Sequence, residues 1–355
     1  MSILRSKWLY VVAILAMAAA HAYQMSHRAH PEERGISTAA TPSIEPSASS
    51  QPPSSLWDLS IDQTNLLKAF QEKPQVAKWF GLWTFLMSLF FIGGIILSIW
   101  AAWSGRLRLL LHAESRLPFR WSFGDVVRIA ILLGGLIGLW PSVGTALRSM
   151  GWSMRNVNPH AWSVGSMFVI DAFMVVLAWA FASANGRTFP GVFGLSLRDA
   201  PTAIGRSLVA YVASFPWLIG LLWAVTEVCH HFGIEPPLEP IHELLFMERS
   251  KAVLAWTTAL ACILGPIAEE TLFRGILFSS LRRYVPRAVA IAISAALFAA
   301  AHTNVVGFLP IFLLGCLLAE LYERTGSLFS PIAVHIVHNT LLIGGGIITR
   351  ELLFT

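Results

Sequence analysis

The chain has 355 residues, of which 55% are hydrophobic and only 13% are charged, and its formal net charge at pH 7 is +5. In soluble domains about a quarter of all residues are charged, and long apolar runs recur here from Trp79 onward. These features exclude a soluble fold and predict a multi-pass membrane protein. The positive excess is arginine in short loops, which fits membrane orientation better than nucleic-acid binding.

The first 25 residues combine positive charge with a short apolar stretch. Arg5 and Lys7 precede the apolar run from Trp8 to Ala20, and "AHA" closes it with the small-x-small pattern of a signal-peptide cleavage site. The segment is either a signal peptide or an uncleaved membrane anchor. We favour the anchor, because multispanning proteins seldom need a removable signal.

Two polar segments separate this anchor from the main apolar region. Residues 26–56 are rich in Pro, Ser, Ala and Thr, as in "STAATPSIEPSASSQPPSS". They cannot bury enough apolar surface to offset the entropy of ordering, so we predict a disordered linker. Residues 57–75, which include "LWDLSIDQTNLLKAF", have apolar residues at roughly helical spacing and predict an amphipathic helix at the membrane surface.

The remaining chain predicts an all-α membrane protein, a bundle of about eight transmembrane helices. A span needs about 20 apolar residues. The first four segments, within residues 76–249, meet this length, whereas the last four, within residues 250–355, are long and broken or short. Irregular backbone at membrane depth is tolerated only where protein or a wet cavity encloses it, so we expect the chemistry in residues 250–355. The segments are Lys78–Trp103, Asp125–Leu147, Ala161–Ala182, Ser207–Val228, Ala252–Leu281, Ala288–His302, Pro310–Glu323 and Pro331–Thr349.

Arginine is distributed unevenly between alternate loops. The loops after the first, third, fifth and seventh segments are rich in it, whereas the opposite loops are poorer and the one from His230 to Glu248 carries glutamates. Positively charged loops stay on the cytoplasmic side, so we assign the arginine-bearing loops there. This orientation also places Arg5 and Lys7 inside, as an anchor requires. The loop arginines are Arg106, Arg108, Arg116, Arg120, Arg187, Arg198, Arg206, Arg282, Arg283, Arg287 and Arg324.

The stretch "GPIAEETLFRG" places two adjacent glutamates and one arginine in an otherwise apolar run. Residues four apart lie on one helix face, so Arg274 lies under Glu270 and an intrahelical ion pair is predicted. Glu269 is left without a local partner, which suits a general base. The alternative is a structural charge cluster that locks helices together. Gly265 and Pro266 predict that the helix kinks or restarts there.

Two later segments bring further polar groups into apolar surroundings. In "FAAAH", Phe298 and His302 share a helix face, and in "HIVHN", His335 and Asn339 do so with His338 beside them. A carboxylate and a histidine can take a proton from water, while a second histidine and an asparagine amide can donate to a tetrahedral oxygen. Together with the glutamates, these segments predict a hydrolytic site.

The predicted topology constrains how this site can assemble. His302 lies far from the cytoplasmic end of its span, whereas His335 lies close to the cytoplasmic start of the last one. For both to meet Glu269, either the last helix begins deep in the protein or the predicted helix boundaries are shifted by several residues.

Other chemistries lack their residues. There is no H-E-x-x-H motif, since "HELLF" at His242 stops short, and there is no G-x-S-x-G. Asp171 stands alone in its span, and we interpret it as a polar group in helix packing. The cysteines show neither a disulfide framework nor metal-ligand spacing, and we interpret them as small buried side chains. They are Cys229, Cys262 and Cys316.

A zinc site remains an alternative, because Glu269, His302 and His335 form a known type of ligand set. We nevertheless expect no cofactor. Asn339 completes the site, and amides are poor zinc ligands. If Glu269 were a ligand, no second carboxylate would obviously be free to act as the base.

The order E-E-x-x-x-R, F-x-x-x-H and H-x-x-x-N, which occurs here as "EETLFR", "FAAAH" and "HIVHN", resembles the CPBP family. These are the CAAX proteases and bacteriocin-processing enzymes, also called the Abi family. The resemblance covers residues 250–349 and implies the eight-helix intramembrane bundle of the family. Residues 1–75 do not resemble the family core.

The resemblance also implies two groups of site residues. The catalytic group consists of Glu269 and His302, which activate water, His335 and Asn339, which form the oxyanion hole, and Glu270, which supports the site. The supporting group consists of Arg274, Phe298 and His338.

We therefore predict an intramembrane endopeptidase that acts on a membrane-embedded or membrane-anchored peptide or protein. Its other expected partner is the lipid bilayer, and we expect it to bind no nucleic acid. The signal-like N-terminus and the arginine pattern are typical of a bacterial inner-membrane protein, so we do not expect a prenylated substrate. The alternatives are a non-catalytic adaptor or immunity protein on the same scaffold and a zinc-dependent protease. A transporter would place broken helices in both halves, whereas the breaks here lie mainly in the C-terminal half.

Overall fold

The computed structural model describes residue 4 and residues 6–28, 63–104, 115–151, 157–234, 244–246, 248–302 and 306–353, and all regular elements within these ranges are helices. The predicted all-α fold is confirmed. Most of the predicted linker and residues 57–62 lie outside the described ranges. Residues 26–28 of that linker, however, belong to the first helix, α1 (Lys7–Arg28).

The predicted membrane spans agree closely with the helices. Within the described residues, six helices are long and apolar enough to cross a membrane, which confirms a multi-pass membrane protein. The first four are α3 (Pro74–Trp103), α5 (Phe123–Ser149), α6 (Pro159–Ala184) and α8 (Ala200–His231). The other two are the helix Lys251–Leu281 and α15 (Phe329–Leu353). The former contains α10 (Lys251–Ala259), α11 (Gly265–Glu270) and α12 (Ser279–Leu281). The shorter α13 (Arg287–Ala301) and α14 (Phe308–Thr325) lie between them.

The expectation that all of the last four segments are irregular is wrong for α15. This helix is continuous over 25 residues and runs past the predicted end at Thr349. Polar groups outside α15 stabilise the added turn, because Lys73 Nζ donates to the carbonyls of Glu351 and Leu352 at 2.9 and 3.2 Å. Hydropathy underestimated the helix because its last turn contains Arg350 and Glu351.

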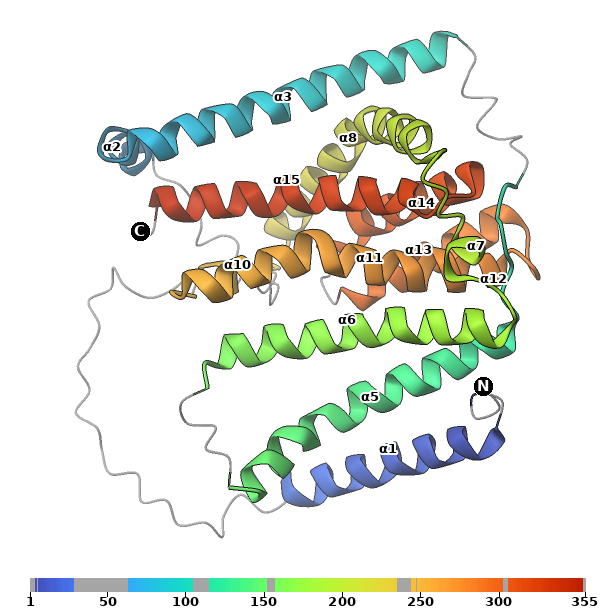
Figure 1. Ribbon diagram of the computed structural model, residues 1–355. Helices are drawn as coiled ribbons and strands as arrows, with labels where there is room; N and C mark the ends of the chain where they lie inside the picture. The colour runs from blue at the N-terminus through green and yellow to red at the C-terminus, as the bar shows by residue number, and fades with distance from the viewer. Residues whose placement is uncertain are drawn as a thin grey trace, which may run out of the picture.

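The N-terminal helix α1 lies beside α5 (Figure 1). Their contact follows the glycines of α5: β-carbons added at Gly134 and Gly138 would lie 3.9 and 3.7 Å from Met17, and one at Gly135 would lie 3.9 Å from Ala13. Small residues let two helix backbones approach closely in a membrane. The predicted anchor therefore forms part of the helix bundle.

Helices α3, α8 and α15 form the opposite layer of the bundle (Figure 1). A β-carbon at Gly94 would lie 2.3 Å from the Val212 carbonyl oxygen, so only glycine allows α3 to approach α8 this closely. Trp83 of α3 packs against Gly345 of α15 and donates from Nε1 to the Leu341 carbonyl at 2.9 Å. The amphipathic α2 (Gln63–Glu72) contacts both α3 and α15.

The arginine-bearing ends of the helices come together at one end of the bundle. Arg282 pairs with the buried Glu323 at 2.9 Å, and Arg287 and Arg324 both pair with Glu320. These contacts join α12, α13 and α14 by their arginine-bearing ends. The alternation of loops inferred from arginine is consistent with this arrangement, and the assignment of this end to the cytoplasm stays a prediction.

The turn between α14 and α15 is buried at this end. Its residues 326–328 lie under residues 115–119 and under α7 (Phe189–Phe193): Arg116 N–H donates to Glu323, and Leu328 N–H donates to Phe193. Gly194 and Gly326 both have a left-handed backbone, and a β-carbon on Gly194 would lie 1.8 Å from the Gly326 oxygen. The last helix thus begins inside the protein, which is one of the two ways in which the predicted site can assemble.

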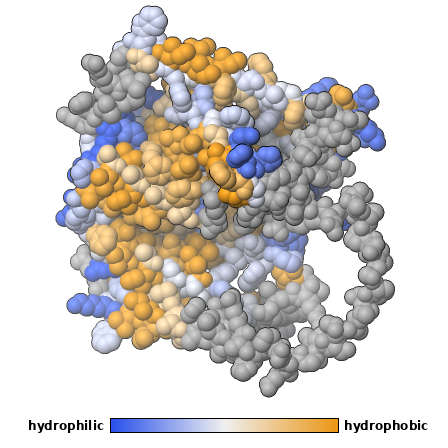
Figure 2. Space-filling model, turned by 180° about the vertical axis from the view of Figure 1, so that it is seen from behind, coloured by the Kyte–Doolittle hydropathy of each residue, from blue (hydrophilic) through white to orange (hydrophobic). Residues whose placement is uncertain are grey.

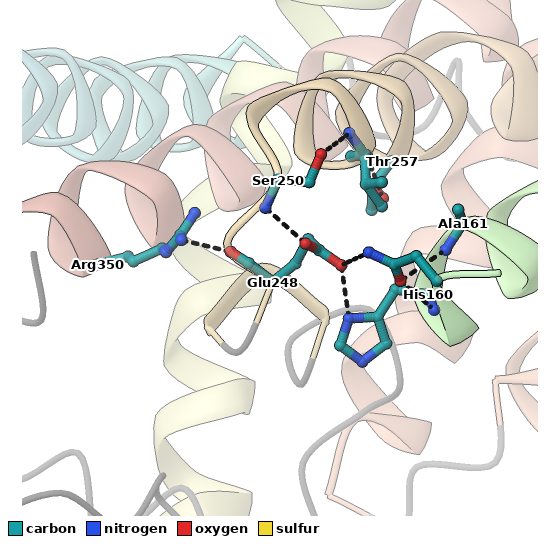
Figure 3. Close-up of polar contacts among 8 residues, drawn as sticks. His160, Ala161, Glu248, Ser250, Thr257 and Arg350 are labelled. Atoms are coloured by element: carbon teal, nitrogen blue, oxygen red, sulfur yellow. Dashed lines mark hydrogen bonds and ion pairs between the residues drawn. The ribbon is translucent and has the colours of Figure 1, made fainter. Parts of the chain in front are cut away.

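A polar cluster ties three helices together at the other end of the bundle (Figure 3). Glu248, only 4% exposed, accepts hydrogen bonds from Ser250 N–H at 2.5 Å and Asn158 Nδ2 at 3.1 Å, and its carboxylate contacts His160 Nδ1 at 2.8 Å. Its backbone carbonyl accepts from Arg350 at 2.5 Å. The cluster connects the start of α6, the start of α10 and the end of α15.

This cluster predicts a specific loss of stability in acid. Burial raises the pKa of the Glu248 carboxyl, but the hydrogen bonds from Ser250, His160 and Asn158 together outweigh it, so the net pKa lies below the ordinary 4.5. Ionised Glu248 therefore stabilises the fold above pH 4.5, and this contribution is lost as the pH falls through the lowered pKa. We expect Glu248→Gln to unfold at a lower temperature than wild type at pH 7, by a margin that shrinks below pH 4.5.

Thermal unfolding of detergent-purified protein from neutral to acid pH measures this margin. Glu72→Gln is a matched control, because it makes the same chemical change at an exposed glutamate of α2. The ion pair of Glu72 with Lys68, at 3.9 Å, is also exposed and therefore contributes little to stability. A stability difference for Glu248→Gln that is the same at every pH would contradict the assignment to an ionised carboxylate.

The surface of the bundle suits a lipid environment. Hydrophobic side chains form a broad patch on the face seen in Figure 2, and hydrophilic ones lie along its left edge, near its centre and at its upper right. Helix α3, for example, exposes large apolar side chains along its whole length. They include Trp79, Phe85, Leu89, Ile92, Ile96, Trp100 and Trp103. Exposed apolar area of this extent is unfavourable in water and is expected in a bilayer.

Candidate active site

The two glutamates lie in the middle of the helix Lys251–Leu281, which Figure 1 shows between α6 and α15. They end α11 (Gly265–Glu270), and this helix follows α10 (Lys251–Ala259) and precedes α12 (Ser279–Leu281). The connecting stretches, Leu260–Leu264 and Thr271–Phe278, are π-helical. Such wide turns leave some backbone groups without a partner in the helix and are frequent at functional sites.

The expected kink or restart at Pro266 takes the form of a π-helical stretch inside a continuous helix. Gly265 N–H bonds to the Leu260 carbonyl, and Pro266 has no N–H to offer. The Ala261 carbonyl is therefore free to accept a hydrogen bond from the Asn339 side-chain amide, at 2.8 Å. The proline, together with the π turn, thus creates an attachment point for α15.

Glu270 and Arg274 form the predicted ion pair. Arg274 Nη1 lies 2.6 Å from Glu270 Oε1, and both side chains are fully buried. The guanidinium also lies 4.1 Å from the centre of the Phe298 ring, and its Nη2 donates to the Gly315 carbonyl at 3.3 Å. The Arg274 side chain therefore connects its own helix to α13 and α14.

Glu269 differs from the adjacent Glu270 in its exposure and in its partners. Its side chain is 31% exposed, and its Oε2 atom is buried without a hydrogen-bond partner among the described residues. The nearest basic group is His335 Nε2, at 3.8 Å from this oxygen. The sequence expectation of a carboxylate without a local partner thus describes the geometry of Glu269.

His335 lies between the two glutamates. Its Nδ1 is 2.8 Å from Glu270 Oε1, the same oxygen that accepts from Arg274. A carboxylate paired with arginine accepts hydrogen bonds, so Nδ1 carries the hydrogen and Nε2 is the nitrogen that faces Glu269. The buried pair Glu270–Arg274 thereby fixes the orientation of the His335 ring.

Phe298 connects the two histidines. Its ring, 1% exposed, lies edge-on to His302 and His335, with ring centres 4.8 and 5.6 Å apart. His302 Nδ1 contacts the Phe298 carbonyl at 2.9 Å; since a carbonyl can only accept, Nδ1 donates and Nε2 is available for other chemistry. No hydrogen bond or ion pair joins His302 to Glu269 within the described part of the chain.

His338 and Asn339 have structural partners. His338 Nδ1 lies 3.0 Å from the hydroxyl of Tyr211, a fully buried residue of α8. Asn339 uses one side-chain N–H for Ala261, and its amide has a second N–H. Tyr211 could not be found from the sequence, because a lone tyrosine in an apolar segment carries no pattern.

Asp171 of α6, interpreted from the sequence as a helix-packing group, lies next to Glu269. A β-carbon added at Gly265 would lie 3.7 Å from Glu269 Oε1 and 3.9 Å from Asp171 Oδ2. The two carboxylates therefore converge over the same glycine. Nothing in a single sequence relates positions 171 and 269, since only the packing of α6 on α11 brings them together.

Fold and site together define a multi-pass membrane protein with a carboxylate–histidine cluster enclosed by its helices. The family described as "Type II CAAX prenyl endopeptidase Rce1-like" matches residues 251–341, which contain all three motifs. The chain belongs to this Rce1-like family of CAAX-type membrane proteases.

Two relatives extend this comparison. An Escherichia coli protein named "Uncharacterized 24.3 kDa protein" is 30% identical over 180 residues, which are 49% of this chain and 74% of the relative. "Putative membrane peptidase YdiL" of Bacillus subtilis is 35% identical over 81 residues, which are 23% of this chain and 33% of that protein. No solved structure matches the chain.

Proposed function

We propose that this protein is an intramembrane endopeptidase that hydrolyses a peptide bond with a water molecule activated by Glu269. The observation that carries the proposal is the contrast between the adjacent glutamates. Glu270 is neutralised by Arg274 and bonded to His335, whereas Glu269 is partly exposed with an unpaired oxygen facing a histidine. A free carboxylate at membrane depth is costly and is generally functional.

In the proposed mechanism, Glu269 takes a proton from water as the water oxygen attacks the scissile carbonyl. His302, whose Nε2 is available, assists this step, as the family resemblance implies. His335 in its protonated form and the second N–H of Asn339 stabilise the oxyanion. Glu270 then balances the charge on His335 and holds its orientation, much as an aspartate orients the histidine of a catalytic triad.

The grouping of the side chains supports a mechanism without zinc. His335 Nε2 lies 3.8 Å from Glu269 Oε2, but His302, the third member of the alternative zinc site, makes no hydrogen bond or ion pair with that carboxylate among the described residues. Throughout the described part of the chain, no three His, Cys, Asp or Glu side chains are grouped as metal ligands. We therefore propose a mechanism that runs without a metal.

We expect peptide cleavage to survive metal chelators. Glu269 supplies the base, so removing metal leaves the rate unchanged, whereas a zinc protease depends on its metal-bound water. The measurements are elemental analysis of active, detergent-purified protein and its cleavage rate before and after chelation. Stoichiometric zinc, with activity lost to chelator and restored by zinc alone, would show the metal-free mechanism to be wrong.

The proposed substrate is a membrane-embedded or membrane-anchored peptide or protein, and the proposed location is the inner membrane of a bacterium. The exposed apolar surface supports a membrane substrate, because a substrate in the bilayer can reach the helix bundle directly from the lipid. The two relatives described above are bacterial. We do not expect prenylation of the substrate to be required.

Cleavage of defined peptides in liposomes tests the proposal. Wild type and Glu269→Ala are incubated with a library of membrane peptides and with a farnesylated CAAX peptide, and the products are identified by mass spectrometry. We expect cleavage of unprenylated membrane peptides by wild type alone. Equal cleavage by both proteins, or none by either, would favour a non-catalytic adaptor, and cleavage of the farnesylated peptide alone would correct the substrate class.

A further inference from the structure

We propose that Asp171 is the general acid of the active site and protonates the leaving nitrogen of the scissile bond. This inference rests on the proposed function. It assigns a catalytic residue to α6, which lies outside residues 251–341, the part of the chain that matches the family.

The first argument is position. Helix α6 packs along α11, and Asp171 Oδ2 and Glu269 Oε1 lie 3.9 and 3.7 Å from the point that a β-carbon on Gly265 would occupy. A side chain at this position would contact both carboxylates. Because residue 265 is glycine, no side chain from α11 crowds the two groups there.

The second argument is the absence of a structural role. Within the described residues, Asp171 makes no hydrogen bond or ion pair, and the charged group that converges with it over Gly265 is Glu269. A carboxylate kept only for helix packing would accept from a donor on the neighbouring helix, as Ser166 of α6 accepts from Trp140 Nε1 of α5. Asp171 is half-buried without such a partner.

The third argument is the difference between the two carboxylates. Neighbouring carboxylates in a low-dielectric site are stable when they share one proton. Glu269 lies 3.8 Å from His335 Nε2, which is cationic in the proposed mechanism, whereas Asp171 has no cation within ion-pair distance among the described residues. The proton therefore resides on Asp171, which makes Asp171 the acid and Glu269 the base.

The reaction balances with these two groups. Water gives one proton to Glu269 while its oxygen bonds to the carbonyl carbon and the carbonyl π electrons move to oxygen. When the oxyanion collapses, the C–N bond breaks and the nitrogen takes the proton of Asp171. The proton on Glu269 then passes to Asp171, which restores both groups and leaves one carboxylic acid and one amine.

The test compares leaving groups. A peptide that wild type cleaves is paired with the p-nitrophenyl ester of its acyl segment, because an amine must be protonated to leave and a nitrophenolate need not be. For Asp171→Asn, we expect amide hydrolysis to fall about 10²-fold and ester hydrolysis to stay within about threefold of wild type, with the alkaline limb of the amide pH–rate profile lost. Asp171→Glu should recover part of the amide rate, and Glu227→Gln, an exposed carboxylate of α8, should change neither rate.

Two outcomes would overturn the inference. An Asp171→Asn protein with wild-type amide hydrolysis, or one in which amide and ester rates fall equally, would show that Asp171 does not protonate the leaving group. If Asp171→Asn does not fold, Asp171→Ser is subject to the same comparison, and failure of both to fold would assign Asp171 a structural role. Glu269→Gln separates the two proposals, since undiminished amide hydrolysis by that variant would refute the proposed function itself.

Discussion

Glu269→Gln is expected to lower the rate of peptide cleavage by about 10²–10⁴-fold, the contribution of a positioned general base, and to leave the protein folded. Glutamine keeps the size of the side chain, and Glu269 Oε2 has no hydrogen bond to lose among the described residues. Glutamine cannot accept a proton from water, so the loss should appear in kcat, with KM little changed.

The measurements are the cleavage rate of the identified peptide in liposomes and thermal unfolding in detergent. Glu72→Gln makes the same chemical change on the exposed α2 helix and should leave both quantities unchanged. A Glu269→Gln protein that is fully active would remove Glu269 from the mechanism. One that is inactive because it unfolds would favour the structural charge cluster instead.

Arg274→Ala is expected to cause the largest loss of stability, about 3–5 kcal/mol, because it leaves a buried carboxylate without its partner. Glu270 is 0% exposed and, among the described residues, keeps only His335 as a hydrogen-bond partner, and the Phe298 ring loses the guanidinium that lies 4.1 Å from its centre. We therefore expect low expression in the membrane and a markedly lower unfolding temperature, together with loss of activity.

A double variant separates charge from packing. Glu270→Gln combined with Arg274→Met removes both charges, keeps an acceptor for His335 Nδ1 and fills most of the volume, so it should be more stable than Arg274→Ala. Arg283→Ala, a change at an exposed arginine in the loop between α12 and α13, serves as the control that removes one positive charge outside the buried pair. An Arg274→Ala protein with normal stability and low activity would contradict the division of roles between the two glutamates.

The motifs could be found in the sequence because the chemistry of membrane helices is local. Charge is rare in hydrocarbon, so "EETLFR", "FAAAH" and "HIVHN" are conspicuous in apolar segments, and helix geometry relates Glu270 to Arg274 without knowledge of the fold. The observed ion pair and the helix bounds agree with these predictions. Hydropathy failed only where polar residues continue a helix, as at the end of α15.

What the sequence by itself determined was the all-helical membrane architecture and the residues that meet in its C-terminal half, because hydrophobic length and i, i+4 spacing act within one helix. Only the tertiary structure decided how those residues face each other. The buried α14–α15 turn sets the depth of His335, the Pro266 π turn frees a carbonyl for Asn339, and the packing of α6 on α11 brings Asp171 to Glu269. These relations join segments far apart in the chain, and the packing of whole helices, which no local pattern encodes, determines them.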